Sequence, residues 1–205
     1  FMNVGFEVQI PGLANQRWDM VNTGMFFTPE RVKIMRMVPY YVNGLAIVVE
    51  RGNPLGVTGY AELAGHPVAT EIAGFADATL RAENERQVAA GMESMRIQAF
   101  NTYAEAFAAL DASQVRAVFI GDAPATYFAE QGRFSVGASG LNPGTPGAFD
   151  FDGATGEVLA EAVAQALREM VADGTYHDLL GRYGVTPLEF WADYPGDIQV
   201  FYNPD

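Results

Sequence analysis

The chain has 205 residues, of which 49% are hydrophobic, so one or two domains with a sizeable core are expected. Its formal net charge of −13 disfavours nucleic-acid binding, because phosphates demand a basic surface. The absence of cysteine excludes disulfides, thiol catalysis and thiolate metal sites. The two histidines, His66 and His177, are far apart in sequence, so neither a metal site nor a cofactor is expected.

The first third of the chain shows four local signals before its first long strand. The opening residues read as strand-like, and residues 9–13 read as the start of a helix. Residues 18–22 favour a short strand. Thr28 followed by Pro29 predicts a helix start, because threonine can cap a helix and proline suits its first position. Residues 45–50 form a β-rich run that ends at Gly52-Asn53-Pro54.

The middle of the chain alternates strands and helices. Strands are predicted over residues 66–72, 95–100 and 115–120. Helices are predicted over residues 77–90, after the capping box of Thr102 and Glu105, and after Asp122. This alternation is typical of α/β layers.

The last third combines a glycine-rich and proline-rich stretch with two helices. A strand over 134–138 is followed by a predicted loop over 140–147. A long amphipathic helix over 157–172 is predicted to stop at Gly174, and a second helix covers 176–183. The linker-like stretches 52–59 and 140–147 predict two lobes with two hinge crossings. Residues 1–49 and 137–205 would form the first lobe, and residues 50–136 the second.

The segment from Gly24 to Arg31 is the best candidate site in the sequence. Exposed N–H groups at a helix start favour an anion, and Arg31 could hold a carboxylate through two parallel hydrogen bonds. The alternative, equally open from spacing alone, is that Thr28 only caps the helix and Arg31 is a solvated surface charge.

Two further places could contact a ligand. Asp122 follows an apolar strand, where ligands bind in open α/β sheets, and it could pair with an ammonium group; alternatively it is a turn aspartate before Pro124. Gly74 and Phe75 precede a helix, which also fits an ordinary strand-to-helix turn. Phe6 and Phe26 could offer rings to a cation, although lone aromatics more often lie in the core. No catalytic triad can be assembled. An acid–base pair of carboxylates is left open by the sequence, but none is singled out, and no enzyme is expected.

Several motifs resemble the family 3 bacterial solute-binding proteins, the polar amino-acid receptors of ABC transporters. The matching stretches are IPGL at 10–13, GMFFTPER at 24–31, PYYVNGLAIVVERGNP at 39–54, ELAGHPVAT at 62–70, VRAVFIGDAP at 115–124 and VADGTYHDLLGRYGV at 171–185. They run in family order across nearly the whole chain. The resemblance implies a two-lobed, type 2 periplasmic-binding-protein fold, with mixed sheets flanked by helices and two hinge crossings.

The resemblance also implies roles for individual residues. Phe6 stands where an apolar residue packs on the ligand, Gly74 and Phe75 stand where a turn donates to its carboxylate, and Asp122 stands near the acid that holds its ammonium. Thr23, Gly24, Phe26 and Arg31 stand at the carboxylate site, and Thr28 is added to the candidate ligand-binding residues from the predicted helix start.

Departures from the family pattern bear on the ligand. The family usually has a hydroxyl residue at the position of Phe26 and a threonine at the position of Gly74. The family's acidic residue aligns either with Asp122 or, one position earlier, with Gly121. The extra ring favours a bulky, methylated or cyclic cation.

By resemblance, the chain is expected to capture an amino acid or zwitterionic derivative in the periplasm and deliver it to a membrane permease. The alternatives are a cyclohexadienyl dehydratase built on the same fold and the sensor domain of a signalling protein. In the family, a strand and a helix precede the segment that begins here at Phe1. The first lobe is therefore expected to be incomplete, with self-association as one outcome.

Overall fold

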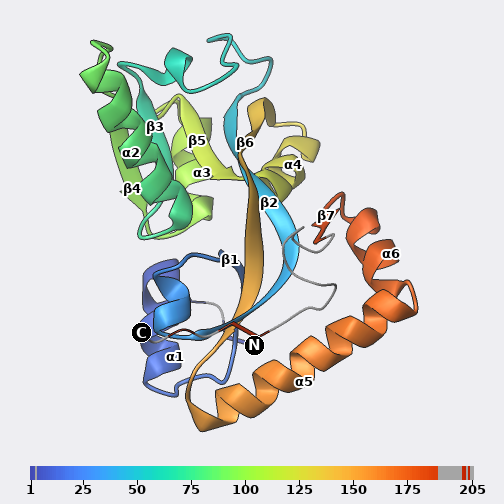
Figure 1. Ribbon diagram of the computed structural model, residues 1–205. Coiled ribbons are helices and arrows are strands. Elements are labelled where there is room, and N and C mark those ends of the chain that lie inside the picture. Colours follow the sequence, from blue (N-terminus) through green and yellow to red (C-terminus); the bar gives the residue numbers. More distant parts are fainter. Residues whose placement is uncertain (3, 189–199, 202, 204–205) are drawn as a thin grey trace. The chain divides into compact units, whose positions relative to one another are not determined.

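The computed structural model describes residues 1–2, 4–188, 200–201 and 203 (Figure 1). The chain divides into two compact units, each built from two segments. Unit 1 comprises Phe1–Glu7 and Gly44–Pro143, and unit 2 comprises Val8–Asn43 and Gly144–Asp205. Two long strands, β2 (Arg36–Glu50) and β6 (Phe134–Phe151), have residues in both units. Each unit is described by itself below.

Unit 1 is built around three parallel strands: β3 (Pro67–Glu71), β4 (Arg96–Phe100) and β5 (Ala117–Gly121). β3 lies in the middle and pairs with both of the others, while β5 also pairs antiparallel with β2. Every residue of β5 is buried, as expected for a strand whose two faces are both covered. The carboxyl ends of β3, β4 and β5 therefore share one edge.

Three helices cover the unit 1 sheet: α2 (Phe75–Ala89), α3 (Tyr103–Asp111) and α4 (Asp122–Glu130). The chain passes from β3 out to β4 and then back past β3 to β5. Right-handed crossovers consequently place α2 and α3 on opposite faces of the strands, as Figure 1 shows. Phe107 of α3 stacks on Phe128 of α4, with ring centroids 3.8 Å apart, and both rings belong to the core of the unit.

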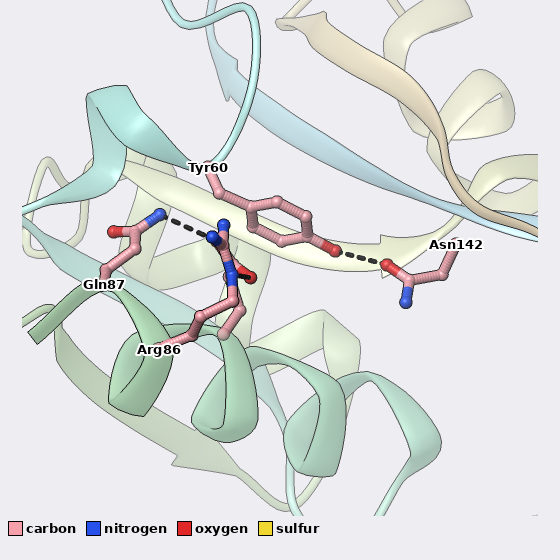
Figure 2. A network of polar contacts seen from close by, with 5 residues as sticks. Tyr60, Arg86, Gln87 and Asn142 are labelled. Atoms are coloured by element: carbon pink, nitrogen blue, oxygen red, sulfur yellow. Dashed lines mark hydrogen bonds and ion pairs between the residues drawn. The ribbon is translucent and has the colours of Figure 1, made fainter. Parts of the chain in front are cut away.

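Figure 2 shows polar contacts of unit 1, one between Tyr60 and Asn142 of β6 and others within α2. The Tyr60 hydroxyl donates to the side-chain oxygen of Asn142 at 2.7 Å. On α2, Glu83 accepts hydrogen bonds from Arg86 at 2.6 Å and from Gln87 at 3.0 Å. Burial, and secondly the charge of Glu83, raises the pKa of Tyr60 to about 12, so its hydroxyl stays a donor at neutral pH.

Unit 2 contains β1 (Val21–Phe26), which pairs antiparallel with β6, and β7 (Thr186–Pro187), which pairs antiparallel with β2. β6 lies between β1 and β2 in the sheet. A short helix, α1 (Gln9–Ala14), contacts β1.

Two C-terminal helices complete the described part of unit 2: α5 (Gly153–Ala172) and α6 (Thr175–Arg182). Asp152 caps α5 by accepting from the Gly153 N–H at 2.7 Å. Gly174 separates the two helices with a φ of 85°, the left-handed conformation that suits glycine. Apolar residues of α5 and α6 pack with Val38 and Phe151 into the core of the unit. No helix in the described ranges is long and apolar enough to cross a bilayer.

Most predicted elements are confirmed within a few residues. They are α1 to α6, β3, β4 and β5, with β1 displaced to Val21–Phe26. The capping box of α3 is also confirmed, since Thr102 and Glu105 each accept from the other's backbone N–H.

Three predictions are wrong. The described residues before Phe6 hold no strand, and the first described element is a 3₁₀ helix at Phe6–Val8. The predicted loop at 140–147 lies inside β6, which absorbs its irregular residues through positive φ angles at Gly140, Asn142 and Gly144. The helix predicted at Thr28 is a single 3₁₀ turn, Arg31–Lys33, because the long β2 begins at Arg36.

Within β2 the chain passes from unit 2 to unit 1 between Asn43 and Gly44. Within β6 it passes back to unit 2 between Pro143 and Gly144. The stretch 52–59, which the sequence suggested as a linker, lies within unit 1. The division into lobes at 1–49, 50–136 and 137–205 stays a prediction.

Candidate functional site

The turn after β1 in unit 2 carries the predicted anion site. β1 ends at Phe26, and the Arg31 N–H then donates to the Thr28 hydroxyl at 3.3 Å and to the Thr28 carbonyl at 3.1 Å. The Thr28 side chain therefore closes this turn, but the N-cap of the following 3₁₀ helix is Glu30 and it makes no side-chain cap. A three-residue 3₁₀ helix has no substantial dipole, however, so anion binding here depends on the Arg31 side chain rather than on a helix N-terminus.

The guanidinium of Arg31 is anchored to the backbone. Its Nη1 donates to the carbonyl oxygen of Phe26 at 2.7 Å, and the residue is partly buried. Burial lowers the pKa of Arg31, whereas the nearby carboxylates of Asp150 and Glu30 raise it. Arg31 is thus held in one orientation and is not a fully solvated surface charge. An oriented guanidinium is suited to bidentate recognition of a carboxylate.

Thr23 and Gly24 make contacts within unit 2 that explain these residue types without a ligand. The Thr23 hydroxyl donates to the side-chain oxygen of Gln9 at 3.0 Å. Gly24 has a φ of 66° and its carbonyl accepts from the Tyr41 hydroxyl at 3.3 Å. A Cβ at Gly24 would lie 2.4 Å from that hydroxyl oxygen, and a Cβ at Gly147 would lie 1.9 Å from the same ring. Both glycines make room for Tyr41.

The carboxyl edge of the unit 1 sheet holds the second group of predicted residues. Gly74 is the N-cap of α2, and Phe75 is its first residue. The residue before them, Ala73, has a φ of 62°, whereas Gly74 has an ordinary φ of −75°. The strained residue of this turn is therefore an alanine, and the neighbouring glycine does not need its conformational freedom.

Asp122 lies at the same edge, as the first residue of α4 after β5. One carboxylate oxygen accepts from the Gly140 N–H at 3.1 Å. Burial raises the pKa of Asp122, and hydrogen bonds from the backbones of Gly140 and Gly44 act in the opposite direction. Its carboxylate thus joins α4 to both strands that continue into unit 2. A carboxylate has about four acceptor positions, so capacity for an ammonium remains.

Glu71, the last residue of β3, is a carboxyl group at this edge that the sequence analysis missed. Burial raises its pKa to about 7; a hydrogen bond from the Tyr103 backbone lowers it, and the charge of Glu7 raises it. No motif signals this residue, because its raised pKa depends on how α3 and the N-terminal segment pack around it. Phe6, predicted to pack on a ligand, lies in the 3₁₀ helix next to Glu7.

Asp150 on β6 is a second missed carboxyl group, this time in unit 2. It is wholly buried, and neither of its carboxylate oxygens has a hydrogen-bond partner among the described residues. Burial raises its pKa well above the ordinary value, although the charge of Arg31 opposes the shift.

A surface cavity of about 590 Å³ lies at the amino edge of the unit 1 strands, opposite the predicted residues. Its lining includes Glu50 at the end of β2, Pro67 and Arg96 at the starts of β3 and β4, and Arg116 before β5. None of the predicted site residues lines it. Within the described ranges, no group of three or more His, Asp or Glu residues could hold a metal ion.

The candidates therefore fall into two groups. Thr23, Gly24, Phe26, Thr28 and Arg31 lie in unit 2. Phe6, Gly74, Phe75 and Asp122 lie in unit 1. Within unit 2 the structure brings Arg31 together with Phe26 and Thr28.

Comparison with known proteins decides the family. Residues 1–186 match the bacterial extracellular solute-binding proteins, family 3. The chain belongs to this family. The resemblance to this family that the sequence motifs indicated is confirmed. The predicted fold class, mixed sheets flanked by helices, is confirmed as well. A search of curated proteins found no match.

Several solved structures share the fold of this family 3 protein. Two are of an ancestral arginine-binding protein: the glutamine-bound form is 28% identical with a TM-score of 0.75, and the arginine-bound form is 27% identical with a TM-score of 0.77. Both alignments cover 89% of this chain, and they cover 78% and 79% of the other chains.

More distant likenesses show the fold alone. A mutant of ArgBP from T. maritima is 23% identical with a TM-score of 0.77, covering 89% of this chain and 76% of the other. An ancestral amino acid-binding protein that is a precursor of cyclohexadienyl dehydratase is 24% identical with a TM-score of 0.74, at the same coverage.

Proposed function

We propose that this family 3 protein binds an amino acid or an amino-acid derivative as the substrate-binding component of an ABC transporter, outside the cytoplasm. Delivery to a membrane permease is part of the proposal. The observation that carries it is the anchored guanidinium of Arg31 in a chain of this family. The arginine-bound and glutamine-bound relatives support an amino acid as the ligand class.

In this proposal, Arg31 receives the ligand carboxylate. Its Nη1 is engaged by the Phe26 carbonyl, which fixes the guanidinium plane before a ligand arrives. Such preorganisation lowers the entropic cost of binding. The preference for a bulky or cationic ligand rests on the aromatic residues Phe6 and Phe26, and their contacts with a ligand stay a prediction, as do those of Gly74, Phe75 and Asp122.

A thermal-shift screen tests the ligand class. Amino acids, opines, betaines and ectoine-like compounds form one set, and sugars and divalent metal ions form the other. A ligand present at about 100 times its Kd stabilises the folded state by about 2.7 kcal/mol. For a chain of this size that corresponds to a rise in Tm of about 5–10 °C. We expect such a rise with at least one zwitterionic compound. A response to sugars or metal ions alone would refute the proposal.

Glu71 favours one alternative function, an acid–base enzyme such as a dehydratase. Its pKa of about 7 would let it protonate a leaving hydroxyl at neutral pH. The alternative predicts loss of water from a cyclohexadienyl substrate, abolished in Glu71→Gln. The binding function predicts no turnover by either protein and the same ligand response in the screen.

A further inference from the structure

The cavity at the amino edge of the unit 1 strands holds a cluster of basic groups that the proposed function does not use. Its volume of about 590 Å³ lies within the range of small-molecule sites, roughly 300–1,000 Å³. Every residue that lines it belongs to unit 1, so its geometry is a property of that unit alone. Arg96, Arg116 and His66 contribute the basic groups of its wall.

The sheet places Arg96 and Arg116 on either side of Pro67. Arg96, the first residue of β4, is the register partner of Pro67. On the other side of β3, Val68 pairs with Ala117. One position earlier, the Arg116 N–H donates to the Pro67 carbonyl at 2.8 Å. Residues level with one another on neighbouring strands point to the same face, and strands lie about 4.8 Å apart, so the two arginines share a face with their backbones about 10 Å apart.

Arg116 is oriented by an acidic neighbour in the same wall. Its Nη1 lies 3.3 Å from Oε1 of Glu50, and the same oxygen accepts from the Ser113 hydroxyl at 3.0 Å. The Arg116 side chain is 45% exposed, so this ion pair contributes little to stability. It does fix the direction of the guanidinium, and it engages Nη1 alone. The other N–H donors of Arg116 remain for a ligand.

Arg96 has no acidic neighbour of this kind. Its backbone N–H donates to the His66 carbonyl at 2.9 Å. Its exposed guanidinium makes no hydrogen bond or ion pair with any residue that the structure describes. Because Glu50 is offset by Arg116, the cavity keeps the full positive charge of Arg96. Only 12 of the 205 residues are lysine or arginine, so an uncompensated guanidinium in a cavity is not one of many surface charges.

Another part of the wall is apolar. Val49 near the end of β2, and Pro54 and Leu55 in the loop that follows, line the cavity beside the basic groups. Leu55 is 37% exposed, so it offers surface to a carbon skeleton. A guanidinium holds a carboxylate through two parallel hydrogen bonds, and two guanidinium groups can each hold one. A molecule with an acidic group at each end of a short apolar chain matches both parts of the wall.

We propose that this cavity is a second binding site, for a small organic dianion such as an aliphatic dicarboxylate. Arg96 binds one carboxylate, and Arg116, oriented by Glu50, binds the other. His66 offers a ring N–H to the same ligand, and the aliphatic chain packs against Leu55. The site shares no residue with the candidates for amino-acid binding, so it is independent of the proposed function.

Calorimetric titration with glutarate tests this site, with butyrate and inorganic phosphate as comparison probes. We expect saturable binding of one glutarate per chain. Butyrate has a single carboxylate and loses one charged pair, so it should bind more weakly by about tenfold or more. Phosphate bound more tightly than glutarate would show that the cavity selects a compact inorganic anion, which contradicts the dicarboxylate assignment.

Two arginine substitutions separate the cavity from general charge effects. Arg96→Gln should weaken glutarate binding by about tenfold or more, because it removes one charged partner from an exposed position. Arg51→Gln removes the same charge from an exposed turn of unit 1 that does not line the cavity, and it should bind glutarate as wild type does. Equal weakening by the two substitutions would mean that only net charge matters, and the site would be ruled out.

A second measurement locates glutarate in wild type without any variant. In proton–nitrogen NMR of the arginine side chains, the Nε–H signals of Arg96 and Arg116 should shift during the titration, and that of Arg31 should not. A shift at Arg31 alone would place glutarate at the amino-acid site and refute the second site. Arg31→Ala should accordingly keep the glutarate affinity of wild type.

The outcomes distinguish this site from the proposed function. Absence of glutarate binding, or equal affinity of Arg96→Gln and wild type, would overturn the second site and leave amino-acid binding intact. Dimers that form in solution, disperse in Arg96→Gln and do not respond to glutarate would show that an acidic side chain of a second copy fills the cavity, which also overturns the proposal. Failure of every amino acid to bind would instead overturn the proposed function.

Discussion

Ala73 has a backbone conformation that its side chain disfavours. Its φ of 62° lies in the left-handed region, which costs an L-residue about 1–2 kcal/mol relative to glycine. Glycine there would relieve that strain but would lose more entropy on folding, by about 0.5–1 kcal/mol. Ala73→Gly should therefore raise the free energy of unfolding, by up to about 1.5 kcal/mol, measured by urea denaturation.

Ala78 is the matched control for this prediction. It is exposed on α2, five residues further along, in an ordinary helical turn. Ala78→Gly should lower the free energy of unfolding by about 1 kcal/mol, because glycine is a poor helix former. If the two substitutions change stability in the same direction, the strain at Ala73 is not what the backbone angle indicates.

At the residue scale, sequence reasoning identified Arg31 but not Asp150. Arg31 stands in the GMFFTPER motif, and its side chain proves to be anchored there. Asp150 stands between Phe149 and Phe151, an alternation that places a polar residue on a solvent face. In the structure Asp150 and Phe151 are both fully buried. Burial on both faces depends on what packs above and below the sheet, a tertiary property that local alternation cannot reveal.

Among the secondary-structure elements, α6 is joined to β2 by hydrogen bonds of one phenol group, in addition to its apolar packing. The Tyr176 hydroxyl donates to the Tyr40 carbonyl of β2 at 2.6 Å and accepts from the Leu188 N–H at 2.7 Å. Tyr176 is 2% exposed, so removal of the hydroxyl leaves the part-buried Tyr40 carbonyl and the buried Leu188 N–H without this partner. Tyr176→Phe should lower the free energy of unfolding by about 1–3 kcal/mol, measured by thermal or urea denaturation.

Tyr183, one residue past the end of α6, provides the comparison. It is 75% exposed, so Tyr183→Phe should change stability by less than about 0.5 kcal/mol. A Tyr176→Phe variant as stable as Tyr183→Phe would show that the two hydrogen bonds do not hold α6 on β2.

The elements that the sequence predicted well are those with a local signal. The capping box of Thr102 and Glu105 marks the start of α3, and Gly174 marks the end of α5. The length of β6 was missed because Gly140, Pro143 and Gly144 are usually signs of a loop. The strand accommodates them here through positive φ angles at Gly140, Asn142 and Gly144. Pairing with strands that are distant in the sequence cannot be predicted from the local sequence.

For the whole molecule, the family assignment and the division into two units frame the function. Arg31 and Asp150 belong to unit 2, and Glu71 and Asp122 belong to unit 1. The acidic charge of −13 does not select a ligand, so specificity must come from individual groups such as Arg31.

The central claim is that Arg31 binds the carboxylate of an amino acid. The most direct test is calorimetric titration of wild type, Arg31→Ala and Lys33→Ala with L-arginine and L-glutamine. Lys33 is an exposed cation in the same 3₁₀ turn, so its removal controls for net charge and for the turn itself. Wild type and Lys33→Ala should bind at least one of the two amino acids with similar affinity. Arg31→Ala should bind it more weakly by about 2–4 kcal/mol, the range for truncating one partner of a buried charge pair. Equal affinity of Arg31→Ala and wild type would contradict the claim.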